Sequence, residues 1–411
     1  MSEEYLKVSN LSVSKNLYDF INNEALPNSG ISSNQFWRGL SSSLEILVPI
    51  NKKLLDDRRK LQLEIDRWHL NNNKNTFDLD GYETFLKKIG YLKKEGPDFK
   101  IKTKNLDEEI SNIPGPQLVV PISNSRYALN AVNARYQSLY DSLYGTDVIQ
   151  TEESASERYD PERGLEVIKY SKKFLDKFFT LKKKSWKDVI EIKIINKDLY
   201  LDTYKIKDQL KEPDKFIGYR GAKEKPTAII LKNNNLHVEI IINPSAFSAK
   251  SDPAGISDII VEAAITTICD HEDSVAGVDA EDKINGYKNW LGLMKGDLKS
   301  KFEKKGKTYI RKLNPDRKFV KKDGSLSKLH GRALLLNRNV GHLMTNPCIL
   351  LKDGSEIPEG ILDAFVTSLC SMHDIKLKKN SRTGSIMIVK PKQHGPEAVS
   401  YTHLTLPTSP K

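Results

Sequence analysis

The sequence predicts a mixed α/β fold, in which a helical N-terminal region precedes half of a parallel (β/α) barrel and an α+β domain is inserted into that barrel. Four short apolar runs begin near residues 117, 265, 333 and 385, and each ends in polar or charged residues. Segments of helical character lie between them, notably residues 360–372. Strand, polar tip and helix in repetition are typical of a (β/α) barrel, which closes with eight strands. Four strands therefore predict half of a barrel.

The first 95 residues are predicted to be entirely helical. Ser33 is placed to cap a helix with an apolar face, and Pro49 is expected to end that helix. A second helix is expected from about Asn51, and a third near residues 82–88. The region is therefore expected to be a separate all-helical unit.

A change of pattern between residues 150 and 260 predicts the inserted domain. Apolar and polar residues alternate there in runs of strand length, and two of the runs are joined by the turn sequence KNNNL at 232–236. Alternation of this kind favours half-buried strands, and a short asparagine-rich turn favours a hairpin. Residues 130–144, which precede this domain, are predicted to be helical.

The bulk composition indicates a globular protein that attracts anions. Apolar residues make up 38% of the 411 residues, charged residues make up 29%, and the formal net charge is +11. This charge favours nucleic acid, membrane headgroups or a phosphate-bearing cofactor as partners. No apolar run is long enough for a transmembrane helix, and the acidic N-terminus lacks a signal core, so a cytoplasmic protein without a membrane partner is expected. The scattered cysteines predict no disulfide framework.

Charged side chains at the expected strand tips are the strongest local signal of chemistry. Asp270, Glu272 and Asp273 follow one strand, and Arg338 follows another. In a (β/α) barrel these tips line the active site, where carboxylates and an arginine suit a divalent cation and an anionic oxygen substrate. Surface charges or a structural ion pair would give the same pattern, and spacing alone leaves both open. No motif of a dinucleotide fold, P-loop, nucleophile elbow or zinc site occurs.

Several longer motifs, in order along the chain, resemble the malate synthase G family. They include GPQLVVP at 115–121, RYALNA at 126–131, EDSVA at 272–276, HGR at 330–332, RNVGHLMT at 338–345 and KNSRTGS at 379–385. The resemblance implies a partial TIM barrel with an N-terminal helical clasp and an inserted domain. On this basis the chain is expected to divide into a clasp and linker at 1–115, a half barrel at 116–134, 263–296 and 334–398, an inserted domain at 135–262 and 297–333, and a non-native, non-helical tail at 399–411.

The resemblance implies a malate synthase, an acyltransferase of the glyoxylate cycle that condenses acetyl-CoA with glyoxylate and water to give (S)-malate and CoA. Arg338 matches the catalytic arginine that contacts glyoxylate. Asp270 and Glu272 match acidic positions close to Mg²⁺ that act through bound water. The positions that match acetyl-CoA contacts are Val119, Arg126, Tyr127, Ser274 and Arg311.

Family members run well past this chain, and the resemblance implies that the Mg²⁺ ligands and the catalytic aspartate base belong to the second half of the barrel and to a C-terminal plug. No metal ligand is therefore assigned in this chain, which is expected to be an inactive fragment of a monomeric enzyme.

Two other classes of function remain as alternatives. A different barrel lyase or aldolase could share a site of carboxylates and an arginine, although the acetyl-CoA positions argue against it. A basic nucleic-acid-binding module is suggested by the charge alone. No RNA- or DNA-binding signature occurs, so no nucleic-acid partner is expected.

Overall fold

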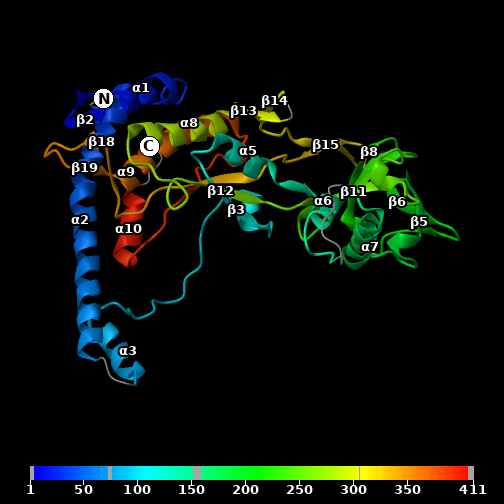
Figure 1. Cartoon of the computed structure of the whole chain (residues 1–411), viewed down its shortest axis with the longest axis horizontal. Coiled ribbons are helices and arrows are strands. Elements are labelled where there is room, and N and C mark those ends of the chain that lie inside the picture. The colour runs from blue at the N-terminus through cyan, green and yellow to red at the C-terminus, as the bar shows by residue number, and fades with distance from the viewer. Residues whose placement is uncertain (1–3, 73–75, 151–158, 305, 406–411) are drawn as a thin grey trace.

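The computed structural model describes residues 4–72, 76–150, 159–304 and 306–405, and Figure 1 shows their arrangement. A parallel sheet and its helices lie between a long N-terminal helix on one side and a strand-rich domain on the other. Within the described residues, no helix combines the length and the apolar character needed to cross a membrane.

Four parallel strands form the central sheet, in the spatial order β20-β17-β12-β3. They are β3 (Gln117–Pro121), β12 (Thr266–Asp270), β17 (Leu334–Arg338) and β20 (Ile388–Val389). Among these four strands, those that are neighbours in the sheet also follow one another along the chain. Their carboxyl ends all lie at the same edge of the sheet, as in a (β/α) barrel. The four predicted strands are confirmed, whereas the described residues form an open sheet and not a closed barrel.

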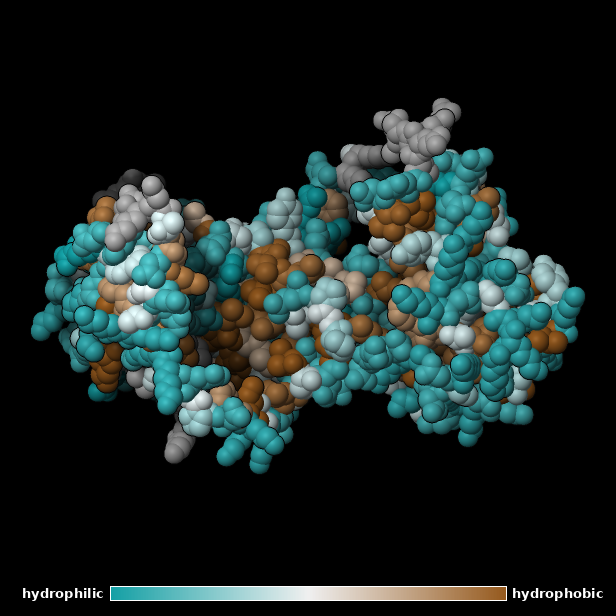
Figure 2. Space-filling view, turned by 90° about the horizontal axis from the view of Figure 1, so that it is seen from below, coloured by the Kyte–Doolittle hydropathy of each residue, from teal (hydrophilic) through white to brown (hydrophobic). Residues whose placement is uncertain are grey.

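Three helices follow the first three strands of this sheet, namely α5 (Ser125–Asn133), α8 (Ala280–Lys295) and α9 (Glu359–Leu377). Helices α8 and α9 pack against each other. The indole N–H of buried Trp290 in α8 donates to the carbonyl oxygen of Thr367 in α9 at 3.1 Å. Seen from below, Figure 2 shows apolar surface in the middle of the molecule, between two mainly hydrophilic ends. A parallel sheet is normally covered on both faces, so this exposed surface agrees with half of a barrel.

The prediction of helix throughout residues 130–144 is wrong at its centre, although residues 130–133 and 139–144 are helical. Helix α5 ends at Asn133, and β4 (Tyr136–Ser138) and α6 (Leu139–Tyr144) follow it. Strand β4 pairs with β11 (Ile256–Glu262) at the edge of the inserted domain. Pairing with a distant strand therefore overrides the local helical preference, which is worth only tenths of a kcal/mol per residue.

The N-terminal region is not entirely helical, which corrects a second prediction. Strands β1 (Tyr5–Val8) and β2 (Leu11–Ser14) form a hairpin, and β2 pairs with β18 (Thr345–Leu350), which in turn pairs with β19 (Glu356–Pro358). Strand β18, the second partner of β2, comes from the far end of the chain, so no local pattern could show this pairing. The region continues through α1 (Lys15–Phe20) and a π-helical turn (Ile21–Ala25).

Helix α2 (Ser33–Asn71) is a single helix that continues through Pro49, where the sequence predicts a break. Its N-cap is Ser32, one residue before the predicted cap, and Ser32 forms a capping box with the helix. Two residues after the proline, the side-chain amide of buried Asn51 donates to the carbonyl oxygen of His342 at 3.1 Å. Packing on both sides of the proline thus offsets its helix-breaking cost of about 3 kcal/mol. Helices α3 (Leu79–Lys88) and α4 (Glu108–Ser111) complete the region, and the predicted third helix is confirmed.

The inserted domain contains a seven-stranded sheet in the order β16-β15-β8-β9-β10-β11-β4 and a three-stranded sheet in the order β5-β6-β7. Asn234 and Asn235 adopt positive φ between β9 and β10, so the predicted hairpin is confirmed. The other elements are α7 (Pro161–Phe178), β5 (Val189–Ile195), β6 (Asp198–Thr203), β7 (Lys207–Asp208), β8 (Phe216–Gly221), β9 (Pro226–Asn233), β10 (Leu236–Ile242), β15 (Arg317–Lys321), β16 (Leu326–Leu329) and three short 3₁₀ turns (Trp186–Asp188, Pro213–Lys215 and Phe247–Ala249).

Two segments differ from the expected division of the chain. Strands β13 (Lys299–Lys304) and β14 (Lys307–Lys312) form a separate hairpin that packs on α5, whereas β15 and β16 of the same expected segment join the inserted sheet. Helix α10 (Pro396–Thr405) extends into the tail that the sequence predicts to be non-helical. The hydroxyl of buried Tyr401 donates to the carbonyl oxygen of Leu47 at 3.2 Å, so burial against α2 supports this helix. Residues 406–411 of the predicted tail lie outside the described residues.

Candidate active site

The carboxyl ends of β12 and β17 bring Asp270 and Arg338 together. The two residues are direct partners in the parallel pairing of these strands. Nε of Arg338 donates to Oδ1 of Asp270 at 2.7 Å, and Nη2 donates to Oδ2 at 2.7 Å. The Asp270 side chain is fully buried, whereas the Arg338 side chain is 21% exposed. Buried Asp270 therefore anchors the arginine, whose side chain remains partly open to solvent at the carboxyl edge of the sheet.

The Asp270 carboxylate is held as an anion. It also accepts the backbone N–H of Glu272 at 2.9 Å, the backbone N–H of Ser274 at 3.0 Å and the Ser274 hydroxyl at 2.7 Å. Burial acts to raise the pKa of Asp270, but the hydrogen bonds from Arg338 and Ser274 hold this pKa well below its usual range. The same contact raises the pKa of Arg338. Asp270 is thus a permanent partner of Arg338 and a poor proton acceptor.

Glu272 binds protein groups and not an open cavity. Its Oε2 accepts the backbone N–H of Gly341, and its Oε1 lies 2.7 Å from Nζ of Lys392. The same lysine lies 2.7 Å from Asp273. Among the described residues, no three histidine, cysteine or acidic side chains converge in a way that could hold a metal ion. Asp270 and Glu272 therefore do not fit a direct Mg²⁺ site, because their oxygens are already engaged.

A buried charged cluster behind this site fixes the loop that follows Arg338. Asp363 of α9 accepts the backbone N–H of Val340 at 2.9 Å and lies 2.6 Å from Nζ of Lys283. Lys390, one residue after β20, donates to the carbonyl oxygen of Val340 at 2.5 Å. Burial lowers the pKa of Lys390 to about 8. Gly360 leaves room for this contact, since a Cβ at that position would collide with Nζ of Lys390.

No sequence pattern singles out Asp363, Lys283 or Lys390 as site residues. Asp363 and Lys390 contact the backbone of Val340, and Lys283 contacts Asp363. Contacts of this kind leave no spacing pattern in a sequence. Lys390 directly follows a predicted strand, so its place at a strand tip was the one available signal.

The positions that match acetyl-CoA contacts form two groups in the structure. Ser274 lies beside Asp270, as described above. Arg126 in α5 and Arg311 in β14 both contact the ring of Phe302 in β13, with Cζ at 5.1 Å and 5.3 Å from the ring centroid. Tyr127 of α5 and Val119 of β3 are 52% and 54% exposed, so both present surface to solvent near the first strand.

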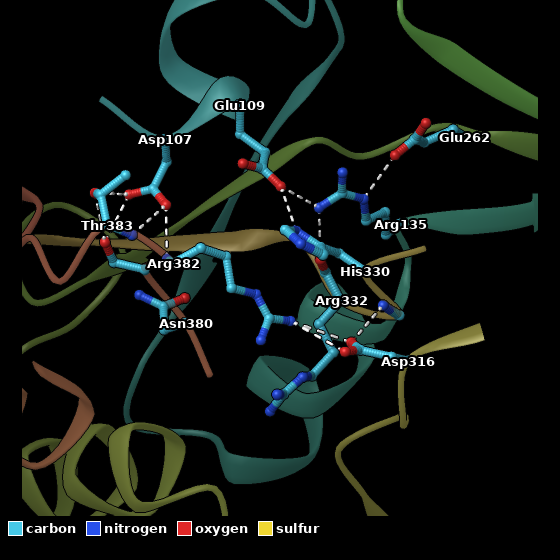
Figure 3. Close-up of polar contacts among 12 residues, drawn as sticks. Asp107, Glu109, Arg135, Glu262, Asp316, His330, Arg332, Asn380, Arg382 and Thr383 are labelled. Atoms are coloured by element: carbon cyan, nitrogen blue, oxygen red, sulfur yellow. Dashed lines mark hydrogen bonds and ion pairs between the residues drawn. The ribbon is translucent and has the colours of Figure 1, made fainter. Parts of the chain in front are cut away.

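A second polar cluster lies at the opposite, amino end of the strands (Figure 3). Arg135 lies between two carboxylates there, with Nη1 at 2.6 Å from Glu109 and Nε at 2.7 Å from Glu262. All three side chains are at most 4% exposed. His330 lies 2.9 Å from the same oxygen of Glu109. This cluster ties the linker before β3 to the entry and the exit of the inserted domain.

Asp107 organises the loop that leads into β20, beside the same cluster (Figure 3). Its carboxylate accepts the backbone N–H of Arg382 at 2.7 Å, the Ser381 hydroxyl at 2.6 Å and the Thr383 hydroxyl at 3.0 Å. The Arg382 guanidinium lies 3.1 Å from Asp316. The motifs HGR and KNSRTGS thus lie at the amino ends of the strands, where barrels carry stability and not chemistry.

Acid is expected to weaken the cluster around Arg135. Burial acts to raise the pKa of Glu109, but hydrogen bonds from His330 and Arg135 hold this pKa at about 2, below the ordinary 4.5. A carboxyl group whose pKa is depressed on folding stabilises the fold above its unfolded pKa and loses that effect as the pH falls. We expect the free energy of unfolding, measured by urea titration, to fall between about pH 4.5 and pH 2. A slope over this range that is equally steep in Glu109→Gln would contradict the assignment.

Parallel strands in sequential order, with an arginine and a carboxylate paired at the carboxyl ends of two neighbours, are arranged as in the (β/α)-barrel class, whose active sites lie at the carboxyl ends of the strands. Family models of malate synthase match three parts of this chain: the N-terminal domain at residues 16–78, the alpha-beta insertion domain of malate synthase G at 159–233, and the TIM barrel domain at 334–404. The chain belongs to the malate synthase family.

Within that family the chain is similar to proteins named malate synthase G. It is 47% identical over 408 residues to the protein of Halalkalibacterium halodurans, 47% over 405 residues to that of Corynebacterium efficiens, and 46% over 407 residues to that of Corynebacterium glutamicum. These matches cover 97 to 98% of this chain and 54 to 56% of the relatives. The chain thus spans about half the length of the curated relatives it matches.

Proposed function

We propose that this chain carries the first half of the active site of a malate synthase, which joins acetyl-CoA to glyoxylate. The observation that carries the proposal is the Arg338 guanidinium at the carboxyl end of β17. Asp270 binds Nε and Nη2 on one edge, and Nη1 makes no hydrogen bond within the described residues. Nη2 also lies 3.8 Å from Oδ2 of Asp273, which is 57% exposed. A rigid, permanently charged fork with Nη1 available suits the carboxylate and the aldehyde oxygen of glyoxylate.

In the proposed reaction, a base removes a methyl proton from acetyl-CoA, and the enolate carbon attacks the aldehyde carbon of glyoxylate. A C–C bond forms, and the aldehyde oxygen becomes an alkoxide that takes a proton. Water then cleaves the thioester C–S bond, which gives malate and CoA. Arg338 stabilises the negative charge that develops on oxygen, as preorganised donors do in other enzymes.

Asp270 and Glu272 do not serve as the base in this proposal, because both carboxylates are bound by cations and backbone N–H groups. They hold Arg338 and the loop after it in place. We propose that the base and the ligands of Mg²⁺ belong to parts of the whole enzyme that this chain does not contain. Val119, Arg126, Tyr127, Ser274 and Arg311 are proposed to bind acetyl-CoA.

The purified 411-residue chain is expected to form no malate. The assay is thiol release from acetyl-CoA in the presence of glyoxylate and Mg²⁺, with the full-length parent enzyme as the positive control. Turnover is expected in the parent alone, because only there would a base and metal ligands face Arg338. Clear turnover by the pure chain would overturn the assignment of the base outside it. A parent without malate formation would refute the proposed function.

A further inference from the structure

The hairpin of β13 and β14 is the most strongly basic element of its size in the chain. Residues 299–312 read KSKFEKKGKTYIRK, with a single acidic residue. The register pairs Phe302 with Tyr309 and Ser300 with Arg311. Side chains alternate between the two faces of a strand, so Phe302, Tyr309 and Arg311 share one face, while Lys301 lies on the other.

The ring of Phe302 gathers two arginines that come from different elements. Arg311 contacts this ring from the neighbouring strand, and Arg126 contacts it from the first turn of α5, with Cζ at 5.3 Å and 5.1 Å from the centroid. Tyr309 stacks on Phe302 with centroids 5.5 Å apart and rings 20° from parallel. The hairpin is anchored to α5 by Asn133, whose side-chain amide donates to the carbonyl oxygen of Lys312 at 2.9 Å.

Among the residues that the structure describes, the two guanidinium groups lack anionic partners. Within the described ranges, neither Arg126 nor Arg311 forms an ion pair or a side-chain hydrogen bond, and the ring of Phe302 is their shared contact. Two like charges held near one ring repel each other, and attraction to the ring face offsets only part of this repulsion. Such an arrangement favours a ligand that brings more than one negative charge.

A groove of about 660 Å³ opens beside Arg311. Side chains of Asn130, Asn133 and Gln137 line it from one side, and β14 lines it from the other. This volume lies within the range of small-molecule sites, and amide side chains can exchange hydrogen bonds with a base or a ribose. Arg311 lines this groove, whereas Arg126 and Phe302 do not. A nucleotide whose phosphate groups lie at the two arginines and whose base or ribose enters the groove fits this arrangement.

We infer that Phe302 is a positioning residue that holds Arg126 and Arg311 as a clamp for the phosphate groups at the nucleotide end of CoA. The choice of CoA rests on the proposed function. The clamp is built from α5 and the β13–β14 hairpin alone, so it operates in this chain without any other part of the enzyme.

The test is calorimetric titration of the 411-residue chain with adenosine 3′,5′-bisphosphate at low salt. Phe302→Leu keeps an apolar side chain but removes the ring face, and its affinity is expected to fall by about tenfold. Phe302→Trp restores a ring face and is expected to stay within about threefold of the unmodified chain. Lys301→Ala, which removes a charge from the other face of the same hairpin, is expected to stay within about threefold as well. Circular dichroism checks that all variants remain folded.

The inference would be overturned if the chain did not bind the bisphosphate, or if Phe302→Leu bound it as tightly as the unmodified chain. It would also be overturned if Lys301→Ala lost as much affinity as Phe302→Leu, because such a loss would indicate diffuse charge attraction. The full-length parent separates this inference from the proposed function. If the variants of the chain bind as expected but the parent forms no malate, the proposed function is refuted and the inference about Phe302 stands. Malate formation with an unchanged KM for acetyl-CoA in the Phe302→Leu parent would refute the clamp alone.

Discussion

Arg338→Ala in the full-length parent is expected to lower malate formation by roughly a thousandfold. The physical reason is the loss of a permanently charged guanidinium at the carboxyl end of β17, whose Nη1 makes no hydrogen bond within the described residues. Without it, charge that develops on the substrate oxygen meets no preorganised donor from β17. The measurement is kcat/KM for thiol release from acetyl-CoA at saturating glyoxylate.

Arg338→Lys separates charge from geometry, because lysine keeps the charge but cannot offer a planar fork to Asp270 and a second edge to substrate. We expect it to recover less than about a tenth of the unmodified rate. Arg338→Ala leaves the buried Asp270 carboxylate without its guanidinium and is expected to lower stability, although the hydrogen bonds from Glu272 and Ser274 remain. Circular dichroism therefore checks that both variants are folded under the assay conditions. Lys288→Ala, which removes a surface cation 49% exposed on α8, is the control. Near-normal rates in folded Arg338→Ala would show that this arginine does not contact the reacting oxygen.

Arg135→Ala is expected to lower the free energy of unfolding of the chain by about 3 to 5 kcal/mol. The substitution leaves Glu109 and Glu262 buried without the guanidinium between them. Removing one partner of a buried ion pair is costly because the remaining charges are neither solvated nor neutralised. Urea denaturation monitored by circular dichroism measures the loss.

Two comparisons test whether the loss comes from buried charge. Lys15→Ala removes an exposed ion pair with Asp19, whose side chains are 45% and 44% exposed, and should lower the free energy of unfolding far less than Arg135→Ala does. Replacing Arg135, Glu109 and Glu262 together by Met, Leu and Leu should be much less harmful than Arg135→Ala, since no buried charge is left unpaired. A loss below about 1 kcal/mol in Arg135→Ala would mean that water reaches this cluster.

The sequence by itself determined the elements that depend on local pattern. The four barrel strands are short apolar runs that end in polar residues, and such runs indicate buried parallel strands wherever they lie in the chain. The hairpin at Asn234 and Asn235 follows from residues that adopt positive φ at low cost. The placement of Asp270 and Arg338 at strand ends follows from these assignments, because carboxyl ends of parallel strands meet at one edge.

Only the tertiary structure decided the features that depend on distant partners. Strand β2 pairs with β18, and β4 pairs with β11, in regions where the sequence predicts helices. Helix α2 continues through Pro49, where buried Asn51 donates to the carbonyl oxygen of His342 in the loop after β17. Long-range contacts of this kind outweigh local preferences of tenths of a kcal/mol per residue, and they leave no periodic trace in either segment.

The same division holds for the site. Residue types and strand tips sufficed to single out Asp270, Glu272 and Arg338. Their bonding was decided by the fold, because a bidentate contact between Asp270 and Arg338 requires two parallel strands in exact register. The meeting of Arg126 and Arg311 on Phe302 likewise requires a hairpin folded onto a helix. Charge and donor geometry are properties of a residue, whereas the distance between two side chains is a property of the packed chain.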